Sequence, residues 1–317
     1  MNRAELQRKL KGIICATVTP FDDNFEINLG QMHDDTQWWV ENGLVEGKAC
    51  IKVASVMGEV PQLRDDEWPK LVETTVKAAA GRVPIISGIH GKETKRSIED
   101  ALQAQDLGAT GIQVSPPVWN DPNQDDILRY FEAISDAIEI GVMVYNTPWM
   151  AHGEIMPDTF HKMADFEHIV AIKWCMPRSY DYDEAKALAP KFNLLENGKS
   201  LGRIFELGGK GFLDEQALAN PQYELQILEH LEAGRYDEGQ AMWDAISVPL
   251  GKFYQKLQAR SGGQARLKKG VMNAMGHPVG SMRPPSLPLN DQEMDELRDL
   301  LRSFGWPVPE PAAAAAD

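Results

Sequence analysis

Short runs of apolar and β-branched residues recur along the first two thirds of the chain, separated by longer stretches of mixed polarity. Within a run, apolar and polar residues do not alternate, which is typical of parallel strands that are buried on both faces. The pattern predicts eight strands, over residues 12–18, 49–54, 83–89, 111–114, 141–145, 169–173, 193–195 and 211–213.

The stretches between these runs carry apolar residues at helical spacing. Positions 29, 32, 36 and 39, for example, lie three or four residues apart, and Gly43 is a suitable end for that helix. Alternating strands and helices predict an α/β protein, and eight such units predict a (β/α)8 TIM barrel. The competing interpretation is a doubly wound open sheet, but no Gly-x-Gly-x-x-Gly follows the first strand.

After about residue 214 the helical spacing continues without further strand-like runs, and helices are expected over 223–233, 237–257, 263–275 and 291–304. These helices predict a C-terminal helical extension. We therefore expect a barrel over residues 1–214 and a C-terminal helical domain over residues 215–306. The segment 307–317 is rich in proline and alanine, has nothing to bury and is expected to be disordered.

The chain of 317 residues carries 32 basic and 47 acidic side chains, a net charge of −15. This charge disfavours nucleic acid or an anionic membrane as a partner, although a small anionic substrate can still find a locally positive site. The scattered cysteines Cys15, Cys50 and Cys175 form neither a disulfide framework nor a metal-ligand spacing, which favours a reducing compartment. No apolar run approaches the roughly 18–20 residues of a membrane helix, and no signal peptide is evident, so we expect a cytoplasmic protein.

Two polar residues end neighbouring predicted strands, Tyr145 the fifth and Lys173 the sixth. In a (β/α)8 barrel the carboxyl ends of the strands supply the catalytic groups. A lysine there is either paired with a carboxylate or held as a nucleophilic amine, which forms an iminium with a carbonyl substrate. A phenol within reach can carry the protons that this step needs. The residues alone leave open a structural lysine–glutamate pair, with Tyr145 as a core tyrosine.

Six short motifs are spread over nearly the whole chain: Gly12-Ile13 with Thr19-Pro20-Phe21, Gly58-Glu59 with Leu63 and Glu67, Tyr145-Asn146-x-Pro148, Ile169-Val170-Ala171-Ile172-Lys173, Gly208-Gly209-x-Gly211 and Arg283-Pro284-Pro285. Together they resemble the motifs of the dihydrodipicolinate synthase / N-acetylneuraminate lyase superfamily of class I aldolases. The resemblance implies a barrel with a C-terminal helical domain, usually a homotetramer, with Lys173 as the Schiff-base lysine and Tyr145 as the proton relay. It implies no metal and no organic cofactor.

The chain departs from this family where the substrate carboxylate is held. Val56 and Met57 stand in place of paired threonines, and Met150 stands in place of a frequent arginine. Ser55, at a position that the family usually gives to glycine, could supply part of the lost hydroxyl function. Tryptophans stand in the loops that follow two of the strands, Trp119 after the fourth and Trp149 after the fifth. We expect a substrate-binding set of Ser55, Val56, Met57, Gly58, Trp119, Trp149 and Met150.

The sequence therefore predicts a Schiff-base-forming lyase, of the aldolase or hydratase-aldolase type. Its small carbonyl substrate would be a 2-oxo acid or related compound with a bulky, apolar or aromatic group. Two alternatives remain open. One is a dehydratase of a sugar-derived 2-oxo acid, and the other is a catalytically diverged barrel that binds a ligand or a partner.

Other polar residues have weaker signals. Glu59 is expected to orient its loop, and the basic run over 260–269 to form a solvated helix face or a subunit contact. The roles of His90, His152 and Cys175 stay open, as do the direction of the reaction and the place of pyruvate in it.

Overall fold

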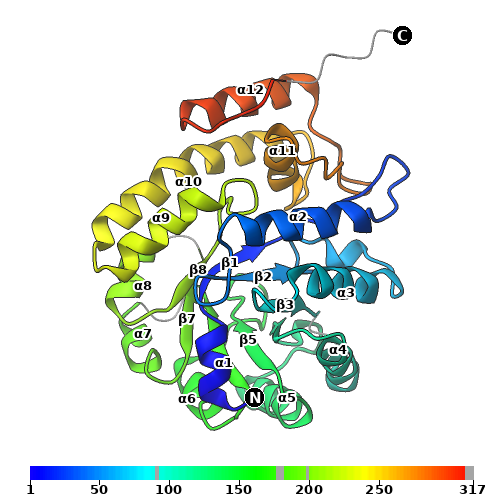
Figure 1. The fold of residues 1–317 in the computed structure, drawn as a ribbon. Coiled ribbons are helices and arrows are strands. Elements are labelled where there is room, and N and C mark those ends of the chain that lie inside the picture. Colours follow the sequence, from blue (N-terminus) through cyan, green and yellow to red (C-terminus); the bar gives the residue numbers. More distant parts are fainter. Residues whose placement is uncertain (90–92, 176–181, 198–199, 311–317) are drawn as a thin grey trace.

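A closed barrel of parallel strands forms the centre of the computed structural model, which describes residues 1–89, 93–175, 182–197 and 200–310 (Figure 1). Within these residues the strands pair in chain order, and the last pairs with the first. This confirms the predicted (β/α)8 barrel. The strands are Gly12–Ala16 (β1), Ala49–Val53 (β2), Ile85–Gly88 (β3), Gly111–Val114 (β4), Gly141–Tyr145 (β5), Ile169–Trp174 (β6), Asn193–Glu196 (β7) and Gly211–Leu213 (β8).

The strand residues are buried on both faces, with the half-buried Tyr145 at the end of β5 as the exception. Side chains from one face fill the barrel, and those from the other pack against the surrounding helices. The predicted and observed strand ends differ by no more than two residues. Short continuous apolar runs, buried on both faces, are therefore a sufficient signal for this sheet.

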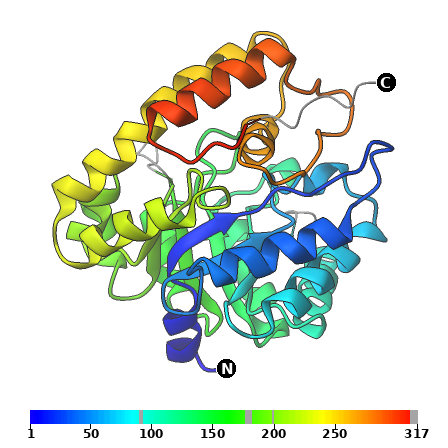
Figure 2. The same cartoon turned by 45° about the horizontal axis from the view of Figure 1, so that its top comes forward.

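Helices surround the barrel and continue beyond β8 (Figures 1 and 2). The helices predicted after residue 214 are all present, with ends within three residues of the expected ones. The helices are Arg3–Lys9 (α1), Leu29–Glu41 (α2), Glu67–Ala79 (α3), Thr94–Asp106 (α4), Gln124–Ala137 (α5), Pro157–Met163 (α6), Asp183–Leu188 (α7), Leu201–Glu206 (α8), Pro221–Glu232 (α9), Tyr236–Gln258 (α10), Arg266–Ala274 (α11) and Asp291–Ser303 (α12), with short 3-10 turns at Val60–Gln62 (η1) and Val118–Asn120 (η2).

Helix α1 closes the N-terminal end of the barrel. Its Leu6 and the following Leu10 are fully buried and belong to the apolar cluster that fills the barrel interior. A side chain at Gly141 would collide with Leu10, because an added Cβ would lie 2.5 Å from its Cδ1. The Asn193 side-chain amide donates to the carbonyl oxygen of Leu10 at 2.9 Å, which fixes the end of the helix to β7.

Two ion pairs tie helix α11 to the opposite, C-terminal end of the barrel. Lys268 Nζ lies 2.6 Å from Asp214 Oδ2 beyond β8, and Lys269 Nζ lies 2.8 Å from Glu59 Oε1 in the loop after β2. All four side chains are buried. The expectation that the basic run over 260–269 faces solvent holds for Arg260 but is wrong for Arg266, Lys268 and Lys269, which are buried. Its lysines on α11 enter the core because carboxylates at the barrel rim balance their charge.

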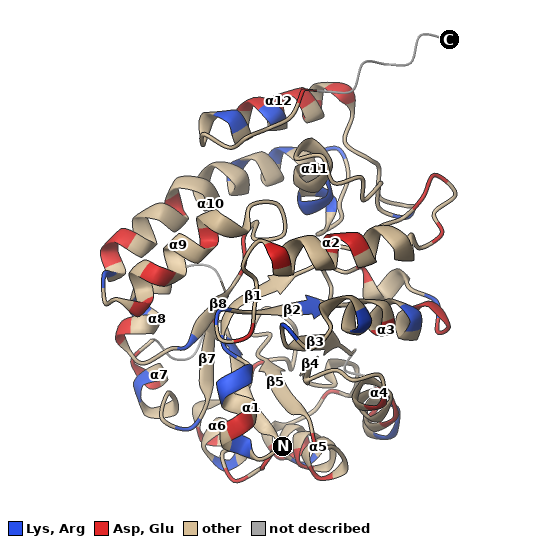
Figure 3. Cartoon of the chain, viewed as in Figure 1, with Lys and Arg blue, Asp and Glu red and all other residues tan. Residues whose placement is uncertain are grey.

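The surplus of acidic residues is spread over the outer helices (Figure 3). Within the part of the chain that the structure describes, no helix is long and apolar enough to cross a membrane.

Candidate active site

Lys173 and Tyr145 lie side by side at the C-terminal ends of β6 and β5, where they are partners in the strand register. The Lys173 Nζ atom sits over the phenol ring, 3.8 Å from its centroid. Lys173 is only 8% exposed. No carboxylate among the described residues lies within ion-pair distance of it, so the structure gives no support to a structural lysine–glutamate pair.

The surroundings of Lys173 favour the uncharged amine. Burial is the largest influence and lowers the Lys173 pKa to about 8, so that a substantial fraction is neutral near physiological pH. Burial also raises the pKa of the Tyr145 phenol, which keeps its proton available for donation. Cys175 is buried and its pKa is raised to about 12, so it is a thiol and not a thiolate nucleophile.

A cavity of about 590 Å³ opens above Tyr145. Trp149 forms one wall and meets Tyr145 edge to face, with ring centroids 5.7 Å apart. Met150 and Val56 are exposed and line the same cavity, whereas Trp119 on η2 is 90% exposed and forms its outer rim. Two tryptophans and a methionine thus line this side of the barrel mouth, together with the polar side chains of Ser55, Gln113, Ser115, Thr147 and Gln264.

Ser55 provides one of the polar groups in this cavity, which we call the apolar cavity after its tryptophan and methionine wall. Its side chain is 3% exposed, it lines the cavity, and no described residue forms a hydrogen bond with its hydroxyl. The residue before it, Ala54, has φ 52°, a left-handed conformation that favours glycine.

Met57 and Gly58 do not line the cavity around Tyr145. Gly58 is buried, its carbonyl oxygen accepts a 2.6 Å hydrogen bond from Thr19, and an added Cβ would lie 2.9 Å from the Ala54 nitrogen. Met57 lines a different cavity, between β8, α10 and α11. The expected binding set is therefore divided between two sides of the barrel mouth.

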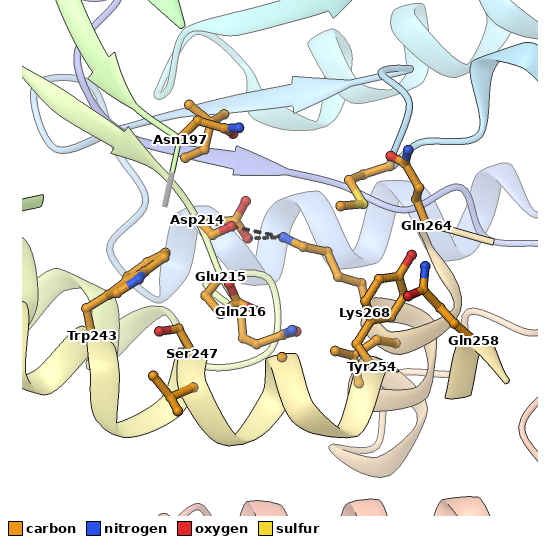
Figure 4. A pocket seen from close by; sticks show the side chains of 15 residues that line it. Asn197, Asp214, Glu215, Gln216, Trp243, Ser247, Tyr254, Gln258, Gln264 and Lys268 are labelled. Carbon is orange, nitrogen blue, oxygen red and sulfur yellow. Dashed lines mark hydrogen bonds and ion pairs between the residues drawn. The ribbon is translucent and has the colours of Figure 1, made fainter. Parts of the chain in front are cut away.

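This second cavity, of about 600 Å³, is polar (Figure 4). The Asp214–Lys268 ion pair lies inside it, and Glu215, Gln216 and Gln258 line its wall. Burial raises the Glu215 pKa to about 7. Such a carboxyl group can donate or accept a proton near neutral pH.

Three polar residues in the barrel were missed in the sequence: Lys52, Gln113 and Asp214. Lys52 lies within β2, is 2% exposed, and donates to Gln113 Oε1 at 3.0 Å. A lysine between apolar strand neighbours is the same signal that selected Lys173, so Lys52 could have been found. Asp214 directly follows the last predicted strand, where the strand-end rule also applies.

Two of the weaker candidates have structural partners. Glu59 is buried against Lys269, with φ 59°, and its pKa is raised by burial. His152 is half exposed and its Nε2 lies 2.8 Å from Asp121 Oδ1. His90 lies outside the described residues. Within the described residues, no three His, Cys, Asp or Glu side chains are grouped so that they could hold a metal ion.

Proteins of one family are similar to this chain over most of its length. The profile of the Dihydrodipicolinate synthetase family matches residues 9–304. The 4-hydroxy-tetrahydrodipicolinate synthase of Heliobacterium modesticaldum is 29% identical over 297 residues, which cover 92% of this chain and 95% of that protein. The enzyme of the same name from Methanococcus vannielii is 28% identical over 297 residues, or 93% of this chain and 99% of that protein.

Solved structures of such enzymes have the same fold. Dihydrodipicolinate synthase from Aquifex aeolicus superposes with a TM-score of 0.79 at 24% identity, covering 94% of this chain and 99% of that chain. The chloride-inhibited enzyme from Acinetobacter baumannii, in complex with pyruvate, gives a TM-score of 0.81 at 23% identity with the same coverage.

Proposed function

We propose that this chain cleaves or forms a 2-oxo acid with a bulky apolar or aromatic group. The chain belongs to the dihydrodipicolinate synthetase family of class I aldolase-type lyases. One observation carries this substrate class: the amine of Lys173 packs on Tyr145, which lines a cavity walled by tryptophan and methionine. Aromatic and aliphatic walls stabilise an apolar substituent by removing its surface from water.

The reaction begins on Lys173 as the free amine. Its nitrogen attacks the ketone carbon of the 2-oxo acid, and the carbinolamine loses water while the Tyr145 hydroxyl donates a proton to the leaving oxygen. The resulting iminium accepts the electron pair of the breaking carbon–carbon bond. An aldehyde leaves as its hydroxyl proton is lost, and the remaining enamine takes up a proton. Hydrolysis then returns the Lys173 amine and releases a shorter 2-oxo acid.

Ser55 is the group that we assign to the substrate carboxylate. Its buried hydroxyl has no partner among the described residues and lines the cavity that Tyr145 also lines. A buried hydroxyl without a hydrogen bond is costly, and a carboxylate oxygen would satisfy it. One hydroxyl group binds a carboxylate less tightly than the hydroxyls of two threonines and the guanidinium of an arginine together. We therefore expect more of the binding energy to come from the apolar substituent.

Borohydride reduction tests the proposal, because it fixes an iminium as a stable secondary amine. We expect a mass increase on the Lys173 peptide with aryl-substituted 2-oxo acids, at lower concentration than with pyruvate, and none in Lys173→Met. Trp149→Ala should weaken trapping of the aryl compound and leave pyruvate unchanged. Absence of an adduct on Lys173 with every carbonyl compound tried would contradict the proposal and favour a barrel that only binds a ligand.

A dehydratase of a sugar-derived 2-oxo acid is the second candidate function. The polar cavity of Figure 4 favours it, because its carboxyl and amide groups can bind hydroxyls and Glu215 has a pKa suited to proton transfer. Trapping with 3-deoxy-2-oxo sugar acids separates the two. If these trap better than aryl compounds, and Glu215→Gln abolishes loss of water from them, the second candidate replaces the first.

The homotetramer and the cytoplasmic location belong to the same proposal. The tetramer is what the family resemblance implies, and sedimentation equilibrium of the purified chain tests it. A monomer at micromolar concentration would remove the tetramer from the proposal.

A further inference from the structure

Gly88 lets the loop after β2 approach the side chain of Gln113. The strand register pairs Gly88 of β3 with Gln113 of β4, so a side chain at either position points to the same side of the sheet. A Cβ at Gly88 would collide with the carbonyl oxygen of Ala54 and would lie 2.7 Å from the Cα of Ser55. The backbone of Ala54 and Ser55 therefore occupies the space of a side chain at position 88, which places Ser55 next to Gln113.

Lys52 holds the Gln113 amide in one orientation. Its Nζ donates a 3.0 Å hydrogen bond to Gln113 Oε1. The Nε2 group of the same amide is left free, since no described residue accepts a hydrogen bond from it. Gln113 lines the apolar cavity, as Ser55 and Tyr145 do. The amide can therefore offer its two N–H donors to a ligand in this cavity, while its acceptor oxygen is occupied.

These donors lie close to the reactive amine. Gln113 pairs in register with Met143 of β5, two residues before Tyr145, and the Tyr145 ring contacts Lys173. After burial, Lys173 is the largest influence on Lys52, whose pKa it lowers, so the two amines share one desolvated space. A 2-oxo acid attached to Lys173 carries its carboxylate on the carbon next to the reacting one. The groups that bind this carboxylate must therefore stand near Lys173.

We propose that Gln113 is a substrate-binding residue that donates, together with Ser55, to the carboxylate of the 2-oxo acid, and that Lys52 is a positioning residue that orients the Gln113 amide. A carboxylate accepts hydrogen bonds and does not donate them, which matches two neighbouring groups that can both donate. Hydrogen bonds to a charged group are also stronger than those between neutral groups. This assignment rests on the proposed function for the identity of the ligand, but the carboxylate site can be tested without it.

The charges of the barrel mouth favour an anion at this place. Lys268 and Lys269 are buried with a carboxylate at 2.6 Å and 2.8 Å. Lys52 and Lys173 are buried as well, but no carboxylate of the described residues lies within ion-pair distance of either amine. A buried amine without an acidic partner leaves a positive charge there uncompensated whenever it is protonated. A ligand carboxylate on Gln113 would supply the missing negative charge.

Binding of a carboxylate that lacks a ketone tests the site apart from any imine. Isothermal titration calorimetry compares 3-phenylpropanoate with 3-phenylpropan-1-ol, which has the same aromatic group and no charge. We expect the natural chain to bind the acid more tightly than the alcohol. In Gln113→Met the dissociation constant of the acid should rise by roughly 10- to 100-fold, the usual effect of one hydrogen bond to a charged group. That of the alcohol should stay the same.

Three further variants make the result decisive. Gln113→Glu gives Lys52 an ionic partner, which covers the case that Gln113→Met does not fold, and its negative charge should abolish binding of the acid. Lys52→Met should weaken binding of the acid alone. In the double variant the loss should be smaller than the sum of the two single losses, because part of the Lys52 effect passes through the amide. The matched control is Gln7→Met on α1, where Gln7 donates to the Lys191 carbonyl oxygen at 3.0 Å, and it should change neither constant.

The outcomes separate this inference from the proposed function. Equal binding of acid and alcohol by the natural chain, or unchanged binding of the acid in both Gln113 variants, overturns the inference. Strictly additive losses remove the positioning role of Lys52. If borohydride traps phenylpyruvate on Lys173 equally well in Gln113→Met, the inference falls and the proposed function stays. If binding of the acid depends on Gln113 but no carbonyl compound is trapped on Lys173, the carboxylate site stays and the proposed function falls.

Discussion

Tyr145 contributes to the site through both its ring and its hydroxyl. Lys173 Nζ lies 3.8 Å from the centroid of the ring, and the centroid of the Trp149 ring lies 5.7 Å from it. The Tyr145 ring therefore separates the amine from the tryptophan wall. The hydroxyl keeps its proton because burial raises the phenol pKa. A group that touches the amine and holds a transferable proton is well placed to assist the loss of water from a carbinolamine.

Removing that hydroxyl should slow imine formation more than it weakens binding. For Tyr145→Phe we expect the rate of adduct formation on Lys173 to fall by roughly 10²- to 10⁴-fold, the usual contribution of a general acid or base. Rapid-quench borohydride trapping measures this rate. Tyr130→Phe is the matched control, since Tyr130 is a buried tyrosine that donates to Ser97 Oγ at 2.8 Å outside the site. Equal rates in the two variants would exclude the relay role.

At the scale of elements, helix α11 connects the two sides of β1. Its consecutive lysines point in different directions, Lys268 to Asp214 beyond β8 and Lys269 to Glu59 beyond β2. Both β8 and β2 pair with β1. The helix therefore clamps the loops that carry Ser55 and Glu215 at the barrel mouth, and it fixes both cavities at once.

Breaking one side of this clamp should cost stability. Glu59→Gln leaves Lys269 buried without a balancing charge, which typically lowers the free energy of unfolding by about 3–5 kcal/mol. Urea titration followed by tryptophan fluorescence measures the change. Glu73→Gln removes the exposed partner of Lys77 and should change it by about 0.3–0.5 kcal/mol. A similar small effect in Glu59→Gln would show that α11 is not held by this pair.

The elements themselves could be predicted because burial on both faces leaves a local trace in the sequence. The strands over 111–114, 141–145 and 211–213 have the predicted ends. The partners of the buried polar side chains could not be predicted, since they depend on the register between strands that lie far apart in the chain. Nothing local places Lys52 beside Gln113, or brings Lys268 to Asp214. Met57 was expected in the same binding set as Trp149, but it lines the other cavity, between β8, α10 and α11.

At the scale of the whole molecule, the barrel is closed at one end by α1 and covered at the other by α11. The predicted division at residue 214 remains a prediction, and the ion pairs of Lys268 and Lys269 cross it. We therefore expect barrel and C-terminal helices to unfold in one transition.

The α1 plug offers a test of the closed end. Leu10 is fully buried against the glycines that begin β4 and β5, so Leu10→Ala should lower the free energy of unfolding by about 2–5 kcal/mol. Leu102→Ala on α4, where the side chain is 37% exposed, should cost far less. Urea titration of both variants gives the comparison, and similar losses would mean that Leu10 does not seal the barrel.

The pairing of β1 with β8 also determines how early the barrel can close during translation. About two hundred residues separate the two strands, and a ribosome adds roughly 5–20 residues per second. One edge of β1 thus stays without its final partner for about 10–40 s. An unpaired strand edge is a template for association with other chains. The yield of this protein should therefore depend on how well the cell shields nascent chains during that interval.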